Sequence, residues 1–480
     1  MTNRIEIARK AQPGWAKLDV GKRLIALKRL RVAVAANLDR VVEVICGEVG
    51  KPPLDALTGD VMVVLEHLRY CEREAAKILR PRHGNKPGML FRGTRFLEIW
   101  EPHGVVVVIA PWNYPLQLAM GPMTTALVAG NAVVLKCSEH TPAVANLINE
   151  LCVEAGLPDG LVQVCWDAPN EASQLIEAQP DFVFFTGSSR NGKVVAERCS
   201  ALQIPTIMEL GGKDACLVFA SCDLQRAVDG VTYAAFSNAG QVCVGAKRVY
   251  VEHAIFDRFL GMFMERVGRV RVGTGTDCDM GPVRMELVRT MLAEQVDDAI
   301  ARGATMHTKW DRGTEDVPPL ILTGVSRDAR LLQEESFGPM VCLEAFRDEE
   351  EAVAMANGSM FALGASVFTG DDAQGQRVAR AMTAGSCTVN DAIRSVGNPY
   401  VAFGGNKASG HGRYHGRAGL EAFSRLKTVM TQYRKQSVEV HWFPFTATTY
   451  ARVRGLMLLR HGTGDLLARV KQLMKAIKQA

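Results

Sequence analysis

Residues 101–115 read EPHGVVVVIAPWNYP, and this stretch decides the class of the fold. The run VVVVIA carries no polar side chain, which is typical of a strand that helices cover on both faces. Similar short runs recur on both sides of it, between residues 96 and 187, and helical segments separate those that follow it. Strands that alternate with helices predict an α/β fold with a parallel sheet and right-handed crossovers. The runs are FLEIW (96–100), AVVLKC (132–137), LVQVCW (161–166) and DFVFFTG (181–187).

The flanks of this region extend the same pattern. Residues 1–80 follow a 3.6-residue apolar period and are predicted to be helical. A loop is expected at residues 80–93. A second alternating section is expected over residues 209–389, a late strand over Lys427–Tyr433, and helices over residues 446–480. The strand candidates of the second section are ACLVFA (215–220), RVYVEH (248–253), MVCLEAF (340–346) and GASVFTG (364–370).

Composition excludes several classes of protein. A chain of 480 residues is long enough for two or three domains, and a net charge of +5 gives no reason to expect nucleic acid as a partner. The 12 cysteines are scattered singly, which argues against a disulfide framework and a metal site. The chain lacks both the apolar run of a signal peptide and a stretch of about 18 apolar residues. We therefore expect a cytoplasmic protein.

The C-terminal segment differs from the rest in charge. Residues 440–480 contain seven Lys or Arg residues and one acid, Asp465. Aromatic residues crowd the segment HWFPF at 441–445, and apolar residues recur at helical spacing after it. Gly462 and Gly464 are expected to divide this segment into two helices. A basic amphipathic segment is typical of a peripheral membrane contact, but its apolar face could equally pack on this chain or on its partner.

Polar residues follow two of the apolar runs, where ligands of open α/β sheets bind. Asn113 follows VVVVIA, and its side-chain amide could donate a hydrogen bond to a developing oxyanion. An Asn at this place is also an ordinary turn residue. Lys136 and Glu139 follow the next strand and could bond two ribose hydroxyls. Alternatively, they form an exposed pair at the start of a helix.

A third strand runs into the segment GSSRNG at residues 187–192. Gly187 and Ser188 open a helix whose N-terminus could approach a pyrophosphate, with Gly192 one turn later. The spacing is not that of the GxGxxG fingerprint, so this motif alone is a weak signal.

Two segments carry candidate reactive groups. Glu209 lies in MELGGK (208–213), and Cys243 lies in NAGQVCVG (238–245), a loop expected before a strand. A cysteine among small residues could be a nucleophile, and a carboxylate could activate the water that hydrolyses its acyl adduct. The alternative is that Cys243, like most cysteines, is a small buried apolar residue.

Together these segments resemble the aldehyde dehydrogenase superfamily. The motifs PWN, KxSE, FTGS, ELGGK, GQVC, EExFGP and FGGxKxSGxGR occur here in the family's order and span residues 101–413. The layout is similar to the short class that includes fatty and aromatic aldehyde dehydrogenases. The resemblance implies a Rossmann-type cofactor domain, an α/β catalytic domain, a small β element for oligomerisation and a homodimer.

The resemblance also implies a role for each matching residue. Cys243 would be the nucleophile and Glu209 the general base of deacylation. Asn113 would form an oxyanion hole with the backbone N–H of Cys243. The remaining matches would bind NAD, with NADP left open because a Glu139 side chain that swings away would admit a 2′-phosphate. These residues are Trp112, Lys136, Glu139, Gly187, Ser188, Gly192, Glu335 and Phe337.

The same resemblance suggests domain boundaries. Residues 1–80 and 102–208 would bind the cofactor, and residues 209–400 would form the catalytic domain. Residues 81–101 and 401–435 would bridge the subunits, and residues 436–480 would be a C-terminal extension.

The chain departs from the family pattern at two places. Cys137 replaces the usual Pro of the KPSE motif, so a looser ribose-binding turn is expected. The segment RYHG (413–416) differs from the commonest family sequence, and neither departure is expected to touch Cys243 or Glu209.

The predicted reaction is NAD(P)-dependent oxidation of an aldehyde to a carboxylic acid through a thioester. The substrate is expected to be a medium- or long-chain aliphatic or an aromatic aldehyde. One alternative is a relative that transfers the acyl group to coenzyme A, which Glu209 argues against. Another is a non-catalytic binding protein on the same fold, which the joint presence of Cys243, Glu209 and Asn113 argues against.

Overall fold

The computed structural model describes residues 2–84, 88, 91, 93–166, 170–433, 439 and 441–478. The loop expected at residues 80–93 and the extension expected from residue 436 lie partly outside these described residues. The chain divides into two compact units. Unit 1 comprises Met1–Pro81 and Ile99–Lys427, and unit 2 comprises Arg82–Glu98 and Thr428–Ala480. In the part of the chain that the structure describes, no helix is long and apolar enough to cross a membrane.

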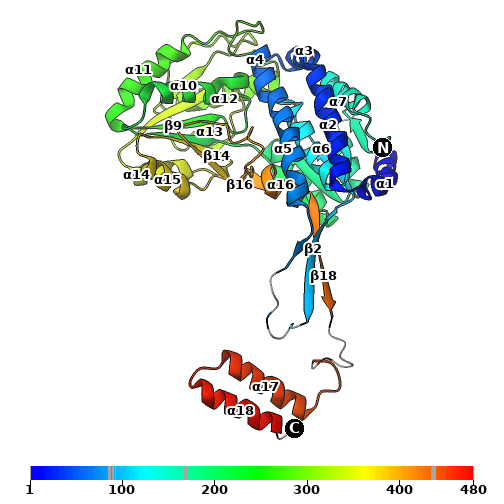
Figure 1. Ribbon diagram of the computed structural model, residues 1–480. Helices are drawn as coiled ribbons and strands as arrows, with labels where there is room; N and C mark the ends of the chain where they lie inside the picture. Colours follow the sequence, from blue (N-terminus) through cyan, green and yellow to red (C-terminus); the bar gives the residue numbers. More distant parts are fainter. Residues whose placement is uncertain are drawn as a thin grey trace. The chain divides into compact units, whose positions relative to one another are not determined.

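Unit 1 begins with the predicted helices. In Figure 1, α2 and α5 lie side by side, and each also packs against the central helix α6. A π-helical turn, η1 (Ala56–Val61), interrupts the regular helices, and the sequence did not predict it. The helices are α1 (Thr2–Ala16), α2 (Val20–Ala36), α3 (Leu38–Val49), α4 (Pro53–Asp55) and α5 (Met62–Ile78).

The first sheet of unit 1 has six strands in the order β17-β7-β6-β3-β4-β5. Five of them are parallel, and β17 runs antiparallel to β7. Residues 105–108 of β3 have no exposed surface, as expected for a strand that helices cover on both faces. The strands are β3 (Val105–Ile109), β4 (Ala132–Lys136), β5 (Val162–Cys165), β6 (Phe182–Thr186), β7 (Thr206–Glu209) and β17 (Gly410–His411). The helices are α6 (Gln117–Ala129), α7 (Pro142–Glu154), α8 (Glu171–Glu177) and α9 (Ser189–Ala201).

The second sheet has seven strands in the order β10-β11-β12-β9-β8-β14-β15. Only β10 runs antiparallel to its neighbour. The strands are β8 (Asp214–Val218), β9 (Ala246–Glu252), β10 (Thr305–Met306), β11 (Leu320–Thr323), β12 (Met340–Phe346), β14 (Gly364–Phe368) and β15 (Ser386–Val389). The helices are α10 (Leu224–Phe236), η3 (Ser237–Gly240), η4 (His253–Ile255), α11 (Phe256–Val267), α12 (Glu286–Ala301), α13 (Arg330–Gln333), α14 (Glu349–Asn357) and α15 (Asp372–Ala381).

The remaining elements of unit 1 connect its parts. A two-stranded sheet joins β13 (Phe361–Ala362) to β16 (Asn406–Lys407), and α16 (Gly416–Ala422) packs against α5 and α6. The predicted parallel α/β architecture is confirmed, and every strand candidate quoted above lies at a strand. The division of unit 1 into a cofactor domain and a catalytic domain stays a prediction.

Unit 2 contains a short sheet and a helical hairpin. The sheet order is β1-β2-β18, with β1 at Arg82–His83, β2 at Thr94–Pro102 and β18 at Ser424–Gln432. The predicted late strand is therefore confirmed. Helices α17 (Ala447–His461) and α18 (Leu466–Lys478) pack against each other, and the predicted break at Gly462–Gly464 separates them.

Candidate active site

Four adjacent strands of the first sheet deliver predicted site residues to one edge. Parallel strands end at the same side of a sheet, and β7, β6, β3 and β4 are neighbours in this order. Glu209 is the last residue of β7, and Gly187 follows β6 directly. Asn113 lies in the turn after β3, and Lys136 ends β4.

Loops before three adjacent strands of the second sheet face this edge. Lys213 precedes β8, Cys243 lies in the loop before β9, and Phe337 lies in the loop before β12. Strands β12, β9 and β8 are neighbours, so these loops also share an edge. The Asn113 side chain donates to the backbone carbonyl of Gln241 at 2.9 Å, which joins the two edges. The site therefore lies between the two sheets of unit 1.

Two glycines of ELGGK allow the loops to approach closely. A Cβ on Gly212 would lie 2.2 Å from the backbone oxygen of Cys243, and a Cβ on Gly211 would lie 2.3 Å from the Glu335 carboxylate. At Gly212 the neighbour is backbone, so only glycine fits there, and at Gly211 a larger side chain would displace the Glu335 carboxylate. The motif thus brings Cys243 and Glu335 against the strand end that carries Glu209.

The predicted nucleophile is half-buried and lies among carboxylates. Burial raises the pKa of the Cys243 thiol above its ordinary value, and Asp214, Glu209 and Glu335 raise it further. These influences place all three carboxylates near the sulfur. They also favour the thiol over the thiolate, so a positive charge in the site would be needed to depress this pKa.

The predicted base is almost completely enclosed. Glu209 is 4% exposed, and among the described residues neither carboxylate oxygen has a hydrogen-bond partner. Burial raises its pKa well above 4.5, and the positive charge of Arg413 acts in the opposite direction. An enclosed carboxylate with unused acceptor sites can bind and activate a water molecule.

The RYHG segment lies within electrostatic reach of the catalytic pair, which sequence analysis did not predict. The charge of Arg413 acts on Glu209, and both Glu209 and Cys243 raise the pKa of the buried Tyr414. Backbone hydrogen bonds between Tyr414 and Phe403 hold this segment against the start of the Gly-rich loop at residues 403–413. A Cβ on Gly404 of that loop would lie 2.8 Å from Glu209 Oε1. The loop therefore encloses Glu209 in addition to forming turns.

Buried cations surround Glu335. Burial raises the pKa of its carboxyl to about 7, and the Gly212 N–H and the charges of Lys213 and Lys247 lower it. Lys247 donates to the carbonyl oxygens of Gly240 and Gly338, both at 2.7 Å. It thereby ties the Cys243 loop to the loop that carries Glu335. Sequence analysis missed Lys247, because no pattern indicates that a lysine within a strand is buried.

On the first sheet, the predicted ribose-binding pair forms an ion pair. Lys136 Nζ lies 2.8 Å from Glu139 Oε2, and half of the Glu139 side chain is exposed. Although burial raises the pKa of Glu139, the hydrogen bond from Lys136 keeps it below its usual value. The N–H of Cys137 donates to the carbonyl of Cys165, a bond that Pro could not make. This turn is therefore tied to β5 rather than loosened.

The predicted pyrophosphate site is the start of α9. Ser188 is the N-cap, and its hydroxyl accepts from Asn191 N. A Cβ on Gly192 would lie 2.2 Å from Leu210, so this glycine lets the helix pack close to the strand end. Near the catalytic loops, Trp112 and Phe337 meet edge to face, with ring centroids 5.9 Å apart.

Of the predicted cofactor residues, Trp112 lines a cavity of about 370 Å³. Trp112, Thr141 and Gln241 line it, so it borders both the Cys243 loop and the turn after β4. The Thr141 hydroxyl is buried and has no hydrogen-bond partner among the described residues. The hydroxyl groups of a dinucleotide can accept a hydrogen bond from a hydroxyl such as that of Thr141. Its phosphates can accept hydrogen bonds from the backbone N–H groups at the N-terminus of α9. The residues present therefore fit NAD(P).

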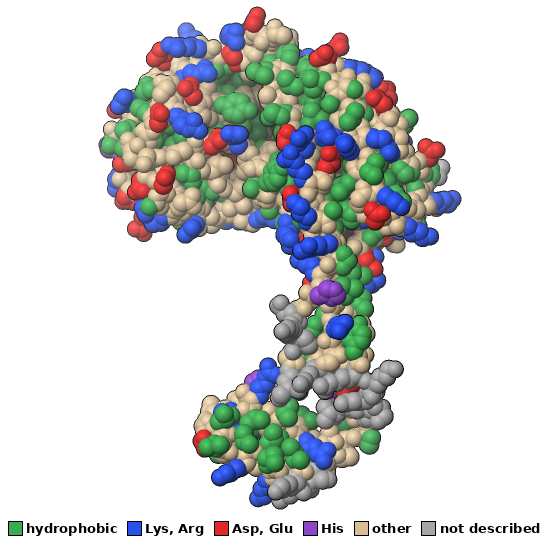
Figure 2. All heavy atoms as spheres, in the orientation of Figure 1, with side chains coloured by type: hydrophobic (Ala, Val, Ile, Leu, Met, Phe, Trp, Pro, Cys, Tyr) green, Lys and Arg blue, Asp and Glu red, His purple; other side chains and the backbone are tan. Residues whose placement is uncertain are grey.

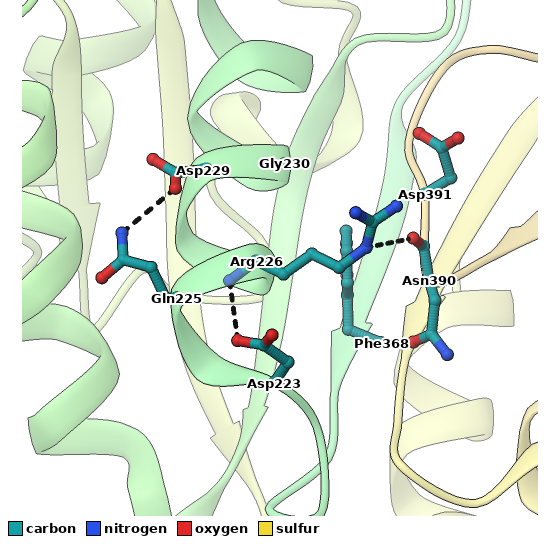
Figure 3. A pocket seen from close by; sticks show the side chains of 8 residues that line it. All are labelled: Asp223, Gln225, Arg226, Asp229, Gly230, Phe368, Asn390 and Asp391. Atoms are coloured by element: carbon teal, nitrogen blue, oxygen red, sulfur yellow. Dashed lines mark hydrogen bonds between the residues drawn. The ribbon is translucent and has the colours of Figure 1, made fainter.

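A second cavity, shown in Figure 3, contains no predicted site residue. Its volume is about 440 Å³, and its polar groups are largely paired with one another. Arg226 Nε donates to the carbonyl of Asn390, and Gln225 donates to Asp229. In the close-up, these side chains lie along one helix and the loop beside it.

Comparison with known proteins agrees with this geometry. A family model described as the aldehyde dehydrogenase family matches residues 1–429. A 4,4′-diapolycopene aldehyde oxidase of Methylomonas sp. is 37% identical and covers 98% of this chain and 89% of its own. A putative NADP(+) succinate-semialdehyde dehydrogenase of Mycolicibacterium smegmatis is 36% identical, over 88% of this chain and 83% of its own.

Solved structures give the same result. An aldehyde dehydrogenase from Brucella melitensis biovar abortus has a TM-score of 0.86 at 31% identity and covers 90% of this chain and 89% of its own. A betaine aldehyde dehydrogenase from Staphylococcus aureus, solved with NAD+, has a TM-score of 0.85 at 29% identity over 92% of this chain and 91% of its own. The chain belongs to the aldehyde dehydrogenase family and is an NAD(P)-dependent aldehyde dehydrogenase.

Proposed function

We propose that this enzyme oxidises a medium- or long-chain aliphatic or an aromatic aldehyde to its carboxylic acid through a thioester on Cys243. One observation carries this proposal. Three elements bring an amide donor, a thiol and an enclosed carboxylate to one place, namely Asn113, Cys243 and Glu209. Acyl transfer to a thiol followed by hydrolysis requires these three groups.

In the first step, the Cys243 thiolate attacks the carbonyl carbon. The oxyanion that forms would accept hydrogen bonds from the Asn113 side chain and the Cys243 backbone N–H. Asn113 uses one amide hydrogen on the Gln241 carbonyl, and an amide has a second hydrogen to donate. One donor of this kind contributes about 3–4 kcal/mol to the stability of the transition state.

In the second stage, loss of hydride converts the thiohemiacetal into the thioester. When bound, oxidised NAD(P) supplies the hydride acceptor. Glu209 then takes a proton from a water molecule as that water attacks the thioester carbonyl. The carboxylic acid leaves, and the thiol of Cys243 is restored.

The proposed cofactor roles follow the resemblance to the family. Lys136 and Glu139 would hold the adenosine ribose, Ser188 the pyrophosphate, and Glu335 the nicotinamide ribose. The negative charge of Glu139 disfavours a 2′-phosphate, which supports NAD. Its half-exposed side chain has room to swing away, and one relative is named for NADP(+), so NADP is the second candidate.

A third cavity supports an apolar substrate. It measures about 430 Å³, and its lining includes Leu54, Tyr233 and Phe236. Ser237 also lines it and directly precedes Asn238, whose side chain donates to the Asn113 carbonyl. An aldehyde whose carbonyl lies at Cys243 could place its apolar body here.

We expect purified enzyme to reduce NAD in the presence of hexanal, decanal or benzaldehyde, with the highest kcat/KM for the longer or aromatic aldehydes. Absorbance of the reduced nicotinamide is the measurement, with NADP in parallel. The acid should form without coenzyme A. A rate that depends on coenzyme A would instead show an acylating enzyme, and no rate with any aldehyde would favour a binding protein.

We also propose a homodimer that forms through β18. This strand is at the edge of its sheet, and Leu426, Val429 and Met430 are all at least 40% exposed on it. Edge strands with exposed apolar side chains readily pair with another chain.

The helical hairpin supports a peripheral membrane contact. A Cβ on Gly455 would lie 2.9 Å from Leu473, so α17 and α18 pack closely at this point. Apolar side chains nevertheless stay exposed, and Figure 2 shows hydrophobic groups gathered on the visible face of the hairpin. Those on α18 are Leu466, Leu467, Val470, Met474 and Ile477. With the basic residues beside them, they fit an anionic lipid surface.

We place the enzyme in the cytoplasm, where its free cysteines would stay reduced.

Deletion of residues 446–480 should abolish binding to anionic vesicles but leave turnover of hexanal and the dimer unchanged, because β18 is retained. Vesicle sedimentation and light scattering are the measurements. Binding of the full-length enzyme should weaken with added salt and be small on neutral vesicles.

Full-length enzyme that ignores anionic vesicles at low salt would contradict the membrane contact. A deletion that lowers Tm or breaks the dimer would instead show that the hairpin packs on the protein. Monomers of the full-length enzyme at micromolar concentration would contradict the dimer.

A further inference from the structure

A fully buried ion pair lies beside the proposed oxyanion donor. Lys51 Nζ is 2.9 Å from Asp60 Oδ2, and neither side chain has exposed surface. Such pairs contribute little net stability, because removing both charges from water costs several kcal/mol per ion. A role in positioning other groups would explain the pair better than stability does.

The ion pair holds both ends of the turn that carries Asn113. Lys51 donates to the backbone carbonyl of Asn113 at 2.8 Å. Asp60 Oδ1 accepts from the backbone N–H groups of Leu116 and Gln117, both at 3.1 Å, at the start of α6. The ammonium group of Lys51 also lies 3.7 Å from the centre of the ring of Tyr114, between these two ends.

The same segment reaches the Cys243 loop through Asp55. Its Oδ2 accepts from the backbone N–H of Asn238 at 2.8 Å, and the Asn238 side chain donates to the Asn113 carbonyl at 2.9 Å. Asn238 and Ala239 have φ values of 48° and 53°, which non-glycine residues rarely adopt. Such strain persists only where neighbouring contacts hold the backbone in place. Asp55 supplies one of these contacts.

The π-helical turn explains how one short segment reaches both loops. Asp55 and Asp60 are five residues apart, and in an α-helix they would point about 140° away from each other. A π-turn bonds residues five apart and so brings them toward one face. The turn η1 spans Ala56–Val61, so it begins directly after Asp55 and contains Asp60.

We propose that Lys51, Asp60 and Asp55 are positioning residues for the oxidation step, which fix the Asn113 amide and the Cys243 loop relative to each other. This inference rests on the proposed role of Asn113. Lys51 and Asp60 have no exposed surface and would not touch the substrate, whereas Asp55 also lines the cavity proposed for its apolar body. Their effect is on the geometry of the oxyanion site, where a displacement of about 1 Å can cost about 100-fold in rate.

The first test is Lys51→Met. We expect kcat to fall by about 100-fold, with KM for the aldehyde and the Kd for NAD nearly unchanged. Because this variant leaves Asp60 unpaired, Lys51→Met/Asp60→Leu removes both charges together and should fold. It should show the same loss of kcat. Normal kcat in a folded variant of either kind would overturn the inference.

A double-mutant cycle separates positioning from general stability. If Lys51 acts through Asn113, Asn113→Ala and Asn113→Ala/Lys51→Met should have the same kcat. Losses that multiply would overturn the inference but leave the role of Asn113 intact. Full activity of Asn113→Ala alone would overturn that role and, with it, this inference.

Two further variants serve as controls. Asp55→Ala should lower kcat, and Asp55→Asn should largely restore it, because the amide oxygen can still accept from Asn238 N. Arg31→Met/Glu72→Leu removes a mostly buried ion pair that joins α2 to α5 rather than to the Asn113 turn or the Cys243 loop. It should leave kcat unchanged. A similar loss there would show that any buried pair matters, and would overturn the inference.

Discussion

Cys243→Ala is expected to lower aldehyde oxidation by at least about 10⁴-fold while NAD binding survives. The side chain would form the covalent bond between the enzyme and its substrate, so a variant without the thiol cannot form the thioester. The variant should fold, because Cys243 is half-buried in a loop and Ala adds no volume. The measurements are steady-state reduction of NAD and the Kd for NAD by fluorescence quenching.

Cys222→Ala is the matched control, because this cysteine is also half-buried. It follows the C-terminal end of β8, whereas Cys243 precedes the N-terminal end of the parallel neighbour β9. It should keep normal activity. More than trace activity in Cys243→Ala would mean that another group is the nucleophile.

Strands β3, β4 and β6 could be predicted because each is a short and almost entirely apolar run. Sequence analysis missed β11, which reads LILT, although it carries the same signal, and other missed strands lack it. β10 has two residues and β15 reads SCTV, so neither shows a clear period or a long apolar stretch. β7 is only TIME, and its importance lies in its last residue, Glu209. Motif order identified this residue where periodicity could not.

Contacts between distant segments could not be predicted in the same way. Lys51 and Asp60 lie in a region whose helical pattern makes charged residues look solvent-exposed. Both side chains are buried in the fold, where the turn after β3 packs on them. The RYHG segment lies about 170 residues from Cys243 in the sequence, and no pattern predicted that the two come close. In the fold, Tyr414 lies beside it.

Burial of the reactive groups was equally invisible in the sequence. The motifs indicated which carboxylates matter but not their protonation. The structure shows that burial raises the pKa values of Cys243, Glu209 and Glu335 together, since the three lie in one enclosed region. The free enzyme therefore favours the uncharged forms of Cys243 and Glu209, and activity should increase as the pH rises and deprotonates them.

Glu209→Gln is expected to stop the reaction after one turnover. The amide has nearly the same shape as the carboxyl but cannot take a proton from water, so the thioester should form and then persist. Rapid mixing with an aldehyde should give a burst of about one reduced nicotinamide per active site. Steady-state turnover should then be slow, and mass spectrometry should find the acyl group on the peptide that contains Cys243.

The pH profile gives a second readout. Because burial raises the pKa of Glu209, deacylation in the native enzyme should speed up as the pH rises through that value, and this dependence should be lost in Glu209→Gln. Glu171→Gln changes another fully buried carboxyl, in α8, and should leave both the burst and the pH profile as in the native enzyme. Unchanged steady-state turnover of Glu209→Gln would exclude Glu209 as the base. A variant with no burst would show that Glu209 acts before the thioester forms, for example on the Cys243 thiol.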